Sequence, residues 1–265
     1  MNKFNYLSLF FLIFMFSCQV TGNKEMLYIG TFSNNDNSGI YVAEFDRDAK
    51  SMLVIDTVTT PQNPSFLSIA SDGNYLYSVN RESVSDDPEH GSISAFQISN
   101  SGLLLSLNQV STGDAGPCYV SSDNQGNWLF TAHYNGGSWG AHQLLSQGVV
   151  SKLVALYEHK GSSIDSARQQ APHAHMISTD PDNEYIVVSD LGLDQVKIHS
   201  IQPTFDSINV IQTTPGSGPR HFAFHPEFGE NGLLYTSHTE KPDTAPADFA
   251  YGDSIKRTLQ WVVTA

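Results

Sequence analysis

Two short segments of this sequence hold the side chains best suited to chemistry. The first is Pro172–His175, with histidines at alternate positions, and the second is Gly218–His221, with an arginine beside a histidine. A histidine whose pKa lies near neutrality can take a proton from water. A guanidinium stays charged and can hold a developing oxyanion, a carboxylate or a phosphate through two hydrogen bonds. His175 and Arg220 therefore supply the groups needed for water to attack a carbonyl carbon.

The 45 positions from His175 to Arg220 are close to the period of an internal repeat. An apolar, aromatic-rich strand, usually preceded by an Asp, Asn or Gly turn, recurs five times. Equivalent positions in the five copies are Tyr28, Tyr77, Phe130, Val187 and Tyr235. Their spacings of 49, 53, 57 and 48 residues lie near the period of β-propeller blades. Because equivalent positions of neighbouring blades face one central channel, the repeat predicts that His175 and Arg220 share a pocket.

The predicted fold class is all-β, with residues 26–235 forming consecutive blades of a β-propeller. A second alternating strand follows three of the repeated strands, over residues 39–45, 91–96 and 195–201. These segments are rich in the β-branched and aromatic residues that favour strands, and no window has a sustained helical period. A β-sandwich with coincidental spacing is the alternative, but it does not explain why turn and strand recur together.

The charge balance narrows the class of partner. The chain has 13 Lys and Arg against 27 Asp and Glu, a formal net charge of −14 at pH 7. Such a field repels phosphate backbones, so we expect no nucleic-acid partner. A small anionic substrate is still compatible with this charge, provided that a local cluster of Arg, Lys or His overcomes the overall repulsion.

The N-terminal residues indicate export. Residues 1–17 have a Lys near the start, an apolar run over Leu7–Phe16 and a Ser directly before Cys18, which is typical of a lipoprotein signal peptide. The run is too short for a permanent membrane span. We therefore expect a lipid anchor at Cys18, a tether over residues 18–25 and a location in the cell envelope, periplasmic or on the outer membrane. An ordinary signal peptide cut near Gly22 is the alternative.

Two longer phrases give the chain a family resemblance. Residues 172–196 begin with Pro-His-Ala-His and end in Val-Ser-Asp-Leu-Gly-Leu-Asp-Gln-Val, and residues 216–226 read Gly-Ser-Gly-Pro-Arg-His-Phe-Ala-Phe-His-Pro. Together they resemble the seven-bladed lactonases, which include bacterial 6-phosphogluconolactonases and are similar to carboxymuconate lactonizing enzymes. The resemblance covers about residues 26–235. It implies His175 and Arg220 as the catalytic positions, with an acidic residue and a second Arg from regions that this sequence lacks.

Further residues are expected to bind substrate or support the pocket: His173, His221 and Asp190. His173 or His175 could instead bond loop carbonyls, and Arg220 could form an ion pair with Asp190 or Asp194. The His-x-His pattern also allows a zinc site completed by His221. No further ligand at a known metal spacing accompanies it, so we expect neither a metal nor a cofactor.

The C-terminal part departs from the family pattern. Family members continue after Gly-Pro-Arg-His with a strand ending in Asn-Glu and with further blades, whereas here Leu233–Tyr235 runs into Thr236–Pro242. Residues 236–265 form an atypical tail with no recognisable strand partner for Tyr235. We therefore expect an incomplete propeller of about five of seven blades, as a truncated or frameshifted reading frame would produce.

The leading functional hypothesis is a lactonase that hydrolyses the cyclic ester of a sugar acid, 6-phosphogluconolactone or another aldonolactone. Export favours an unphosphorylated lactone, because phosphorylated pathway intermediates are cytoplasmic. Two alternatives are a non-catalytic binding propeller on the cell surface, consistent with the missing Asn-Glu pair, and an inactive truncated copy. Cys118, the thiol left in the folded part, is expected to be a buried small side chain rather than a nucleophile.

Overall fold

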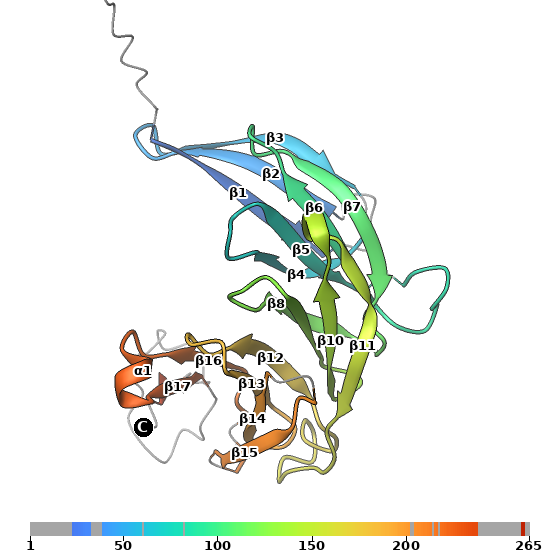
Figure 1. Ribbon diagram of the computed structural model, residues 1–265, viewed down its shortest axis with the longest axis vertical. Coiled ribbons are helices and arrows are strands. Elements are labelled where there is room, and N and C mark those ends of the chain that lie inside the picture. The colour runs from blue at the N-terminus through green and yellow to red at the C-terminus, as the bar shows by residue number, and fades with distance from the viewer. Residues whose placement is uncertain are drawn as a thin grey trace, which may run out of the picture.

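Five antiparallel sheets follow one another along the chain in the computed structural model. The structure describes residues 23–32, 39–59, 61–81, 83–201, 204–213, 215–216, 218–237 and 261–262. Each sheet is one blade with its strands in chain order. Figure 1 shows the blades fanned along an open arc, from blade 1 in blue to blade 5 in orange and red.

The first three blades contain eleven strands. Blade 1 consists of β1 (Lys24–Thr31), β2 (Gly39–Asp46) and β3 (Ser51–Val58). Blade 2 consists of β4 (Pro64–Ile69), β5 (Tyr75–Asn80), β6 (Ser92–Ile98) and β7 (Leu104–Ser111). Blade 3 consists of β8 (Pro117–Ser122), β9 (Trp128–His133), β10 (Ser138–Leu144) and β11 (Val150–Glu158), with a short 3₁₀ helix at Ser146–Gly148.

The last two blades carry the candidate site. Blade 4 consists of β12 (Ala174–Thr179), β13 (Tyr185–Asp190), β14 (Gln195–Ser200) and β15 (Ser207–Gln212). Blade 5 consists of β16 (His221–Phe224), the short helix α1 (Phe228–Asn231), β17 (Leu234–Ser237) and β18 (Trp261–Val262). The predicted all-β propeller with five blades is confirmed, and the β-sandwich alternative falls because each sheet forms from one repeat.

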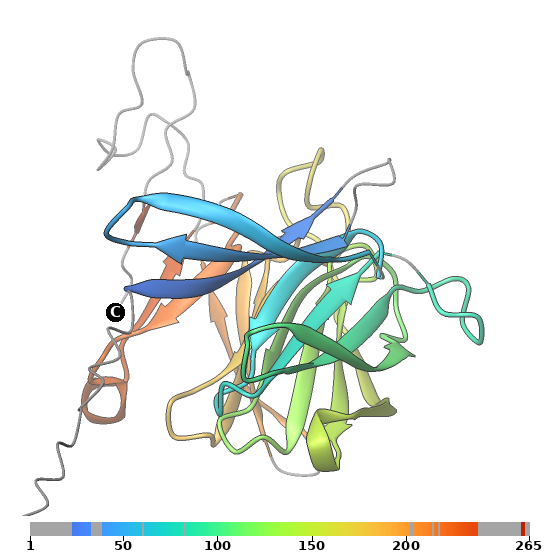
Figure 2. The same cartoon turned by 90° about the horizontal axis from the view of Figure 1, so that it is seen from above.

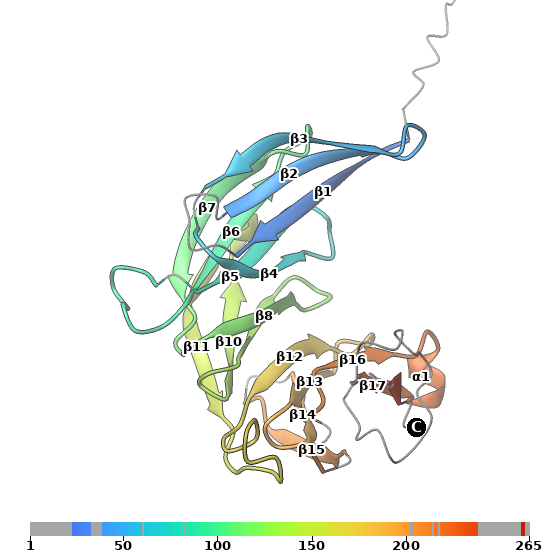
Figure 3. The ribbon, with the colours of Figure 1, turned by 180° about the vertical axis from the view of Figure 1, so that it is seen from behind.

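The first strands of neighbouring blades lie next to each other along the inside of the arc. Strand β4 packs beside β8, β8 beside β12, and β12 touches β16. Figures 2 and 3 show the same fan from above and from behind, with the twist clearest in the long strands of blade 1. Residues at the start of β12 and β16 are thereby brought to one region of the inner surface.

Side chains between blades 3 and 4 form the largest part of the core. Trp139 is fully buried and stacks on Tyr157, with ring centroids 4.4 Å apart and planes at 12°. Phe205 lies edge-on to Trp139 and Phe130 at 6.0 and 6.1 Å. Such aromatic pairs contribute about 0.5–1.5 kcal/mol each beyond the area they bury. This packing fixes blade 4 against blade 3 and so fixes the position of β12.

The recurrent Asp/Asn turn has a structural role at the opposite end of these two blades. Asp123 accepts hydrogen bonds from the backbone of Asn127 and Trp128, and so closes the turn before β9. Asn183, in the equivalent turn of blade 4, donates to Asp123 at 3.1 Å and accepts from the Asn124 backbone at 2.9 Å. The turns therefore tie the blades together, which explains why the repeat contains both the turn and the strand.

Three sequence predictions meet the structure at the ends of the chain. Residues 1–22, including the predicted signal peptide and Cys18, lie outside the described residues. Strand β1 begins at Lys24, two residues earlier than the predicted first blade. Thr236 and Ser237 of β17 pair with Val262 and Trp261 of the tail, although the sequence shows no partner there, because two extended residues suffice for backbone pairing. None of the described helices is long and apolar enough to cross a membrane.

Candidate functional site

His175 and Arg220 come together where the first strands of blades 4 and 5 begin. His175 is the second residue of β12, and Arg220 directly precedes β16. The rings of His175 and His221 lie 5.1 Å apart at 75°. The positive charge of Arg220 acts on the pKa of both histidines. The structure therefore brings His175, His221 and Arg220 to one region, but His175 does not line the cavity to which Arg220 contributes.

His175 is held in its neutral form. Burial, followed by the nearby His221 and Arg220, lowers the pKa of His175 to about 4. Its Nδ1 is buried and has no hydrogen-bond partner within the described residues. The imidazole is therefore uncharged at neutral pH and keeps a lone pair that can accept a proton, but a pKa of about 4 lies below the near-neutral value expected from the sequence and makes His175 a weaker base.

Arg220 is anchored through its backbone, while its guanidinium has no carboxylate partner. Its backbone N–H donates to Ser237 O at 2.9 Å, and its carbonyl accepts the Ser189 hydroxyl at 2.8 Å. The Nε atom is buried without a hydrogen-bond partner, and no described Asp or Glu lies within ion-pair distance. Burial, and then the charge of Arg168, lower the pKa of Arg220. The alternative ion pair with Asp190 or Asp194 is not formed.

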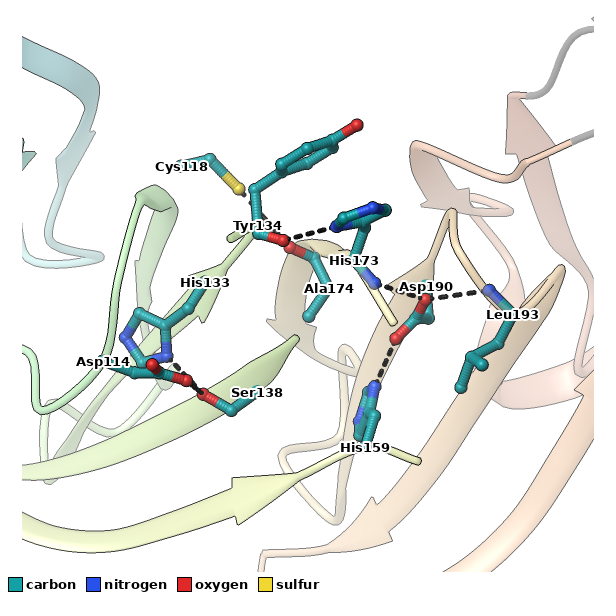
Figure 4. A network of polar contacts seen from close by, with 10 residues as sticks. All are labelled: Asp114, Cys118, His133, Tyr134, Ser138, His159, His173, Ala174, Asp190 and Leu193. Carbon is teal, nitrogen blue, oxygen red and sulfur yellow. Dashed lines mark hydrogen bonds and ion pairs between the residues drawn. The ribbon is translucent and has the colours of Figure 1, made fainter. Parts of the chain in front are cut away.

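His173 is oriented by the backbone of blade 3. Its Nδ1–H donates to Tyr134 O at 2.6 Å, and the two rings stack 4.3 Å apart with an interplanar angle of 8° (Figure 4). Tyr134 also lies edge-on to His175 at 5.8 Å. The expected alternative of a histidine bonded to a loop carbonyl thus holds for His173. With Nδ1 bonded, the Nε2 atom of His173 is the one left for a ligand.

Asp190 is buried behind His173 and holds the backbone of the site in place, and it does not line the site. Its carboxylate is fully buried and accepts hydrogen bonds from His159 Nδ1 at 2.5 Å, His173 N at 2.9 Å and Leu193 N at 3.0 Å (Figure 4). One carboxylate therefore holds the residue before β12, the β13–β14 turn and the end of the β11 segment together.

Equivalent buried polar residues end the second strand of the two preceding blades. Asn80 ends β5 and donates to the Ser92 hydroxyl at 3.2 Å, and His133 ends β9 with Nδ1 2.8 Å from the Ser138 hydroxyl. Figure 4 shows the His133 contact beside the Asp190 network. A polar residue at the end of the repeated strand is therefore a sequence signal for this supporting position, and it recurs at Asp190.

Two residues near the site have no counterpart in the sequence prediction. Arg168, from the segment between β11 and β12, lines a small cavity together with Arg220. Tyr134 stacks on His173 as described above. The position of Arg168 in the sequence does not identify it as a site residue, because the segment between β11 and β12 is not part of the blade repeat. Tyr134 follows directly on the end of the repeated strand β9, so the repeat could have marked it.

Cys118 lies next to the site but is not activated. Its Sγ is within 3.5 to 3.6 Å of the carbonyl oxygens of Ala132, Ala174 and His175. Burial raises the pKa of the Cys118 thiol to about 12, so the thiol is protonated at neutral pH. No group of three or more His, Cys, Asp or Glu suited to a metal ion occurs in the part of the chain that the structure describes.

Comparisons with known proteins identify the family of this chain. Residues 26–243 match the family described as Lactonase, 7-bladed beta-propeller. The 6-phosphogluconolactonases of Bacillus subtilis and Formosa agariphila are each 30% identical, over 77% and 75% of this chain and 57% and 58% of their own length. The periplasmic gluconolactonase of Pseudomonas aeruginosa superposes with a TM-score of 0.72 at 26% identity, over 91% of this chain and 69% of that one. This chain thus spans less than two thirds of the curated relatives, and it belongs to the family of seven-bladed β-propeller lactonases.

Proposed function

We propose that this protein hydrolyses the lactone of a sugar acid at the start of β12 and β16. The observation that carries the proposal is the neutral His175 beside an Arg220 guanidinium that has no carboxylate partner among the described residues. A base and an oxyanion-stabilising group are the two requirements for adding water to an ester carbonyl. The resemblance of the chain to 6-phosphogluconolactonases and to a gluconolactonase supports this class of substrate.

The proposed reaction has two steps. His175 takes a proton from water as the water oxygen attacks the lactone carbonyl carbon, and Arg220 stabilises the negative charge that develops on the carbonyl oxygen. The ring C–O bond then breaks, and protonated His175 returns its proton to the departing ring oxygen. The product is the open hydroxy acid, and the protein returns to its starting state.

The test is a hydrolysis assay over phosphorylated and unphosphorylated aldonolactones, with His175→Ala and Arg220→Ala as variants. Loss of a general base costs about 10²–10⁴-fold in rate, and loss of an oxyanion donor costs about 10²–10³-fold. His225→Ala is the matched control, because His225 follows the far end of β16 and its ring Nδ1 contacts Glu227 N and Asn231 Nδ2 next to α1. Unchanged rates in both site variants would refute the assignment.

A non-catalytic binding propeller is the second candidate. It is favoured by the residues at the end of β17, where Thr236 and Ser237 stand in place of the Asn-Glu pair expected from the family pattern. A well-folded wild-type chain that binds an aldonate but opens no lactone in the panel would establish this alternative. A chain that does not fold at all would support an inactive copy.

We also propose that the protein is exported and anchored through a lipid at Cys18. The signal-like residues 1–17 support this proposal, and so does the resemblance to a periplasmic gluconolactonase. Metabolic labelling with a fatty acid should mark the wild-type protein and not Cys18→Ala. Labelling of both proteins, or of neither, would contradict the anchor.

A further inference from the structure

A cavity of about 270 Å³ lies between blades 2 and 3 and is partly open to solvent. It is bounded by the β4–β5 turn, the start of β5, the β8–β9 turn and the segment after β10. The strands β12 and β16 begin at the proposed catalytic pair, whereas β4 and β8 end at this cavity, so it lies at the opposite end of the blades. A space of this volume holds several water molecules. It therefore admits a ligand about the size of one sugar ring.

Tyr77 is an almost fully buried residue of this cavity whose hydroxyl group is left for a ligand. The residue is 1% exposed, and its ring packs with Val120 and Leu129 in the core between the two blades. The hydroxyl makes no hydrogen bond within the described residues. Burial, and then the nearby Asp72 and Tyr75, raise the pKa of Tyr77, so the phenol keeps its proton. Because Asp72 and Tyr75 also line the cavity, the hydroxyl offers a donor and an acceptor on the cavity side.

Tyr75 contributes a second ring, which is held in place by the segment after β10. Residues 75 and 77 lie on the same face of β5, because side chains alternate along a strand. A Cβ on Gly148 would overlap the Tyr75 ring, so the backbone at Gly148 lies directly against it. Asn108 of β7 fixes the end of this segment, since it donates to Val150 O at 2.8 Å and accepts from Val150 N at 3.1 Å. The ring is therefore positioned before any ligand arrives, which lowers the entropic cost of binding.

The rest of the lining combines apolar groups, uncharged polar groups and one carboxylate. The apolar residues are Ala70, Leu144 and Leu145. The uncharged polar side chains are Ser71, Asn124, Gln125 and Gln147. Asp72 is the carboxylate, and no Lys, Arg or His lies among the described residues that line the cavity. The lining therefore disfavours an anion, whereas amides and a carboxylate match sugar hydroxyl groups as donors and acceptors, and the aromatic and aliphatic surface matches the C–H groups of a sugar ring.

Gln147 has a backbone conformation that costs free energy. Its φ of 62° lies in the left-handed region, where a residue with a Cβ is strained. Strain of this kind is found preferentially at binding and catalytic sites. The strained residue lines this cavity, so a role of its amide in binding gives a reason for glutamine where glycine would be more stable.

We propose that the cavity between blades 2 and 3 is a second binding site, which takes one ring of a neutral sugar. The Tyr77 hydroxyl, the Asp72 carboxylate and the Gln147 amide bond the sugar hydroxyl groups, and Tyr75 supports the ring. The proposal goes beyond the proposed hydrolysis and does not depend on it, because His175 and Arg220 do not line this cavity. A ligand of about twelve non-hydrogen atoms in an open site binds in the millimolar range.

The first test measures sugar binding and its dependence on Tyr77. Glucose, galactose and N-acetylglucosamine are titrated into the full 265-residue chain and followed by ligand-observed NMR. For the sugar that binds best, Tyr77→Phe should weaken binding at least about fivefold. Tyr185→Phe is the matched control, because Tyr185 begins β13 as Tyr75 begins β5 and does not line the cavity; its affinity should stay within about twofold of wild type. No binding of any of the three sugars up to about 100 mM, or equal binding by Tyr77→Phe and wild type, would overturn the site.

The second test separates binding from stability and from the catalytic site. Gln147→Gly should weaken sugar binding at least about threefold while the urea midpoint stays equal or rises, because glycine relieves the strained backbone. A Gln147→Gly variant that binds the sugar as wild type does would remove the amide from the site. His175→Ala should bind the sugar within about twofold of wild type, and a larger loss would place the sugar at the catalytic pair and overturn the second site. Tetramethylammonium that binds more tightly than every sugar, and through Tyr77, would show a cation site instead.

Discussion

Asp190 offers the sharpest test of how the site is held together. Its buried carboxylate accepts three hydrogen bonds, two from the backbone of His173 and Leu193 and one from His159. Asp190→Ala leaves three buried donors without a partner, at about 1–3 kcal/mol each, so we expect a loss of about 5 kcal/mol in the free energy of unfolding. Asp190→Asn keeps one oxygen for the two backbone donors and opposes its amide to His159, so the expected loss is about 2 kcal/mol.

Urea unfolding, followed by circular dichroism and tryptophan fluorescence, measures both variants. Asp182→Asn is the matched control, because Asp182 lies on an exposed turn of the same blade and should change the unfolding free energy by less than about 0.5 kcal/mol. Equal losses in Asp190→Ala and Asp190→Asn, or losses below about 1 kcal/mol in both, would show that the three hydrogen bonds do not hold the site.

Three further predictions follow from burial and close contacts. Burial lowers the pKa of His142 to about 4, so the unfolded chain binds more protons than the folded chain between about pH 6.5 and 4, and stability should fall as the pH drops through this window, by up to about 1.4 kcal/mol per pH unit from this residue. His142→Asn should therefore make the dependence of the urea midpoint on pH shallower, and an unchanged dependence would contradict the burial argument. A Cβ on Gly192 would lie 1.9 Å from Ala171 O, so Gly192→Ala should lower the unfolding free energy by about 3 kcal/mol and reduce lactone hydrolysis. The control Gly126→Ala adds a Cβ that meets no atom within 4 Å and should cost only about 1 kcal/mol for its positive φ, so similar losses in the two variants would contradict the steric reasoning. Because the Arg220 charge helps to lower the pKa of His175, Arg220→Gln should raise that pKa, as followed by proton NMR of the imidazole, and an unchanged pKa would argue against the action of the Arg220 charge on His175.

The repeat made the architecture predictable, and it predicted that β12 and β16 bring His175 and Arg220 into one region, although the two residues are not at equivalent strand positions. A fixed period identifies equivalent strand positions, and equivalent inner positions of neighbouring blades must converge. The same reasoning could have identified Asp190 as a supporting residue, since Asn80 and His133 end the equivalent strands of blades 2 and 3.

The contacts made by irregular segments were not predictable in this way. Arg168 reaches the cavity because Gln169 is tied to Asp194, a long-range contact between a loop and a turn. Loop conformations depend on such individual hydrogen bonds rather than on a periodic pattern. The pairing of β17 with Trp261–Val262 was missed for a related reason, because backbone pairing leaves little trace in the sequence of so short a strand.

A double-mutant cycle on kcat/KM tests most directly whether His175 and Arg220 act on the same bound lactone. His175→Ala, Arg220→Ala and the double variant are compared with wild type on one aldonolactone. If both side chains stabilise one transition state, the double variant should lose clearly less activity than the product of the two single losses. Single losses that multiply fully, or a wild-type chain that folds and opens no lactone, would contradict a shared catalytic site.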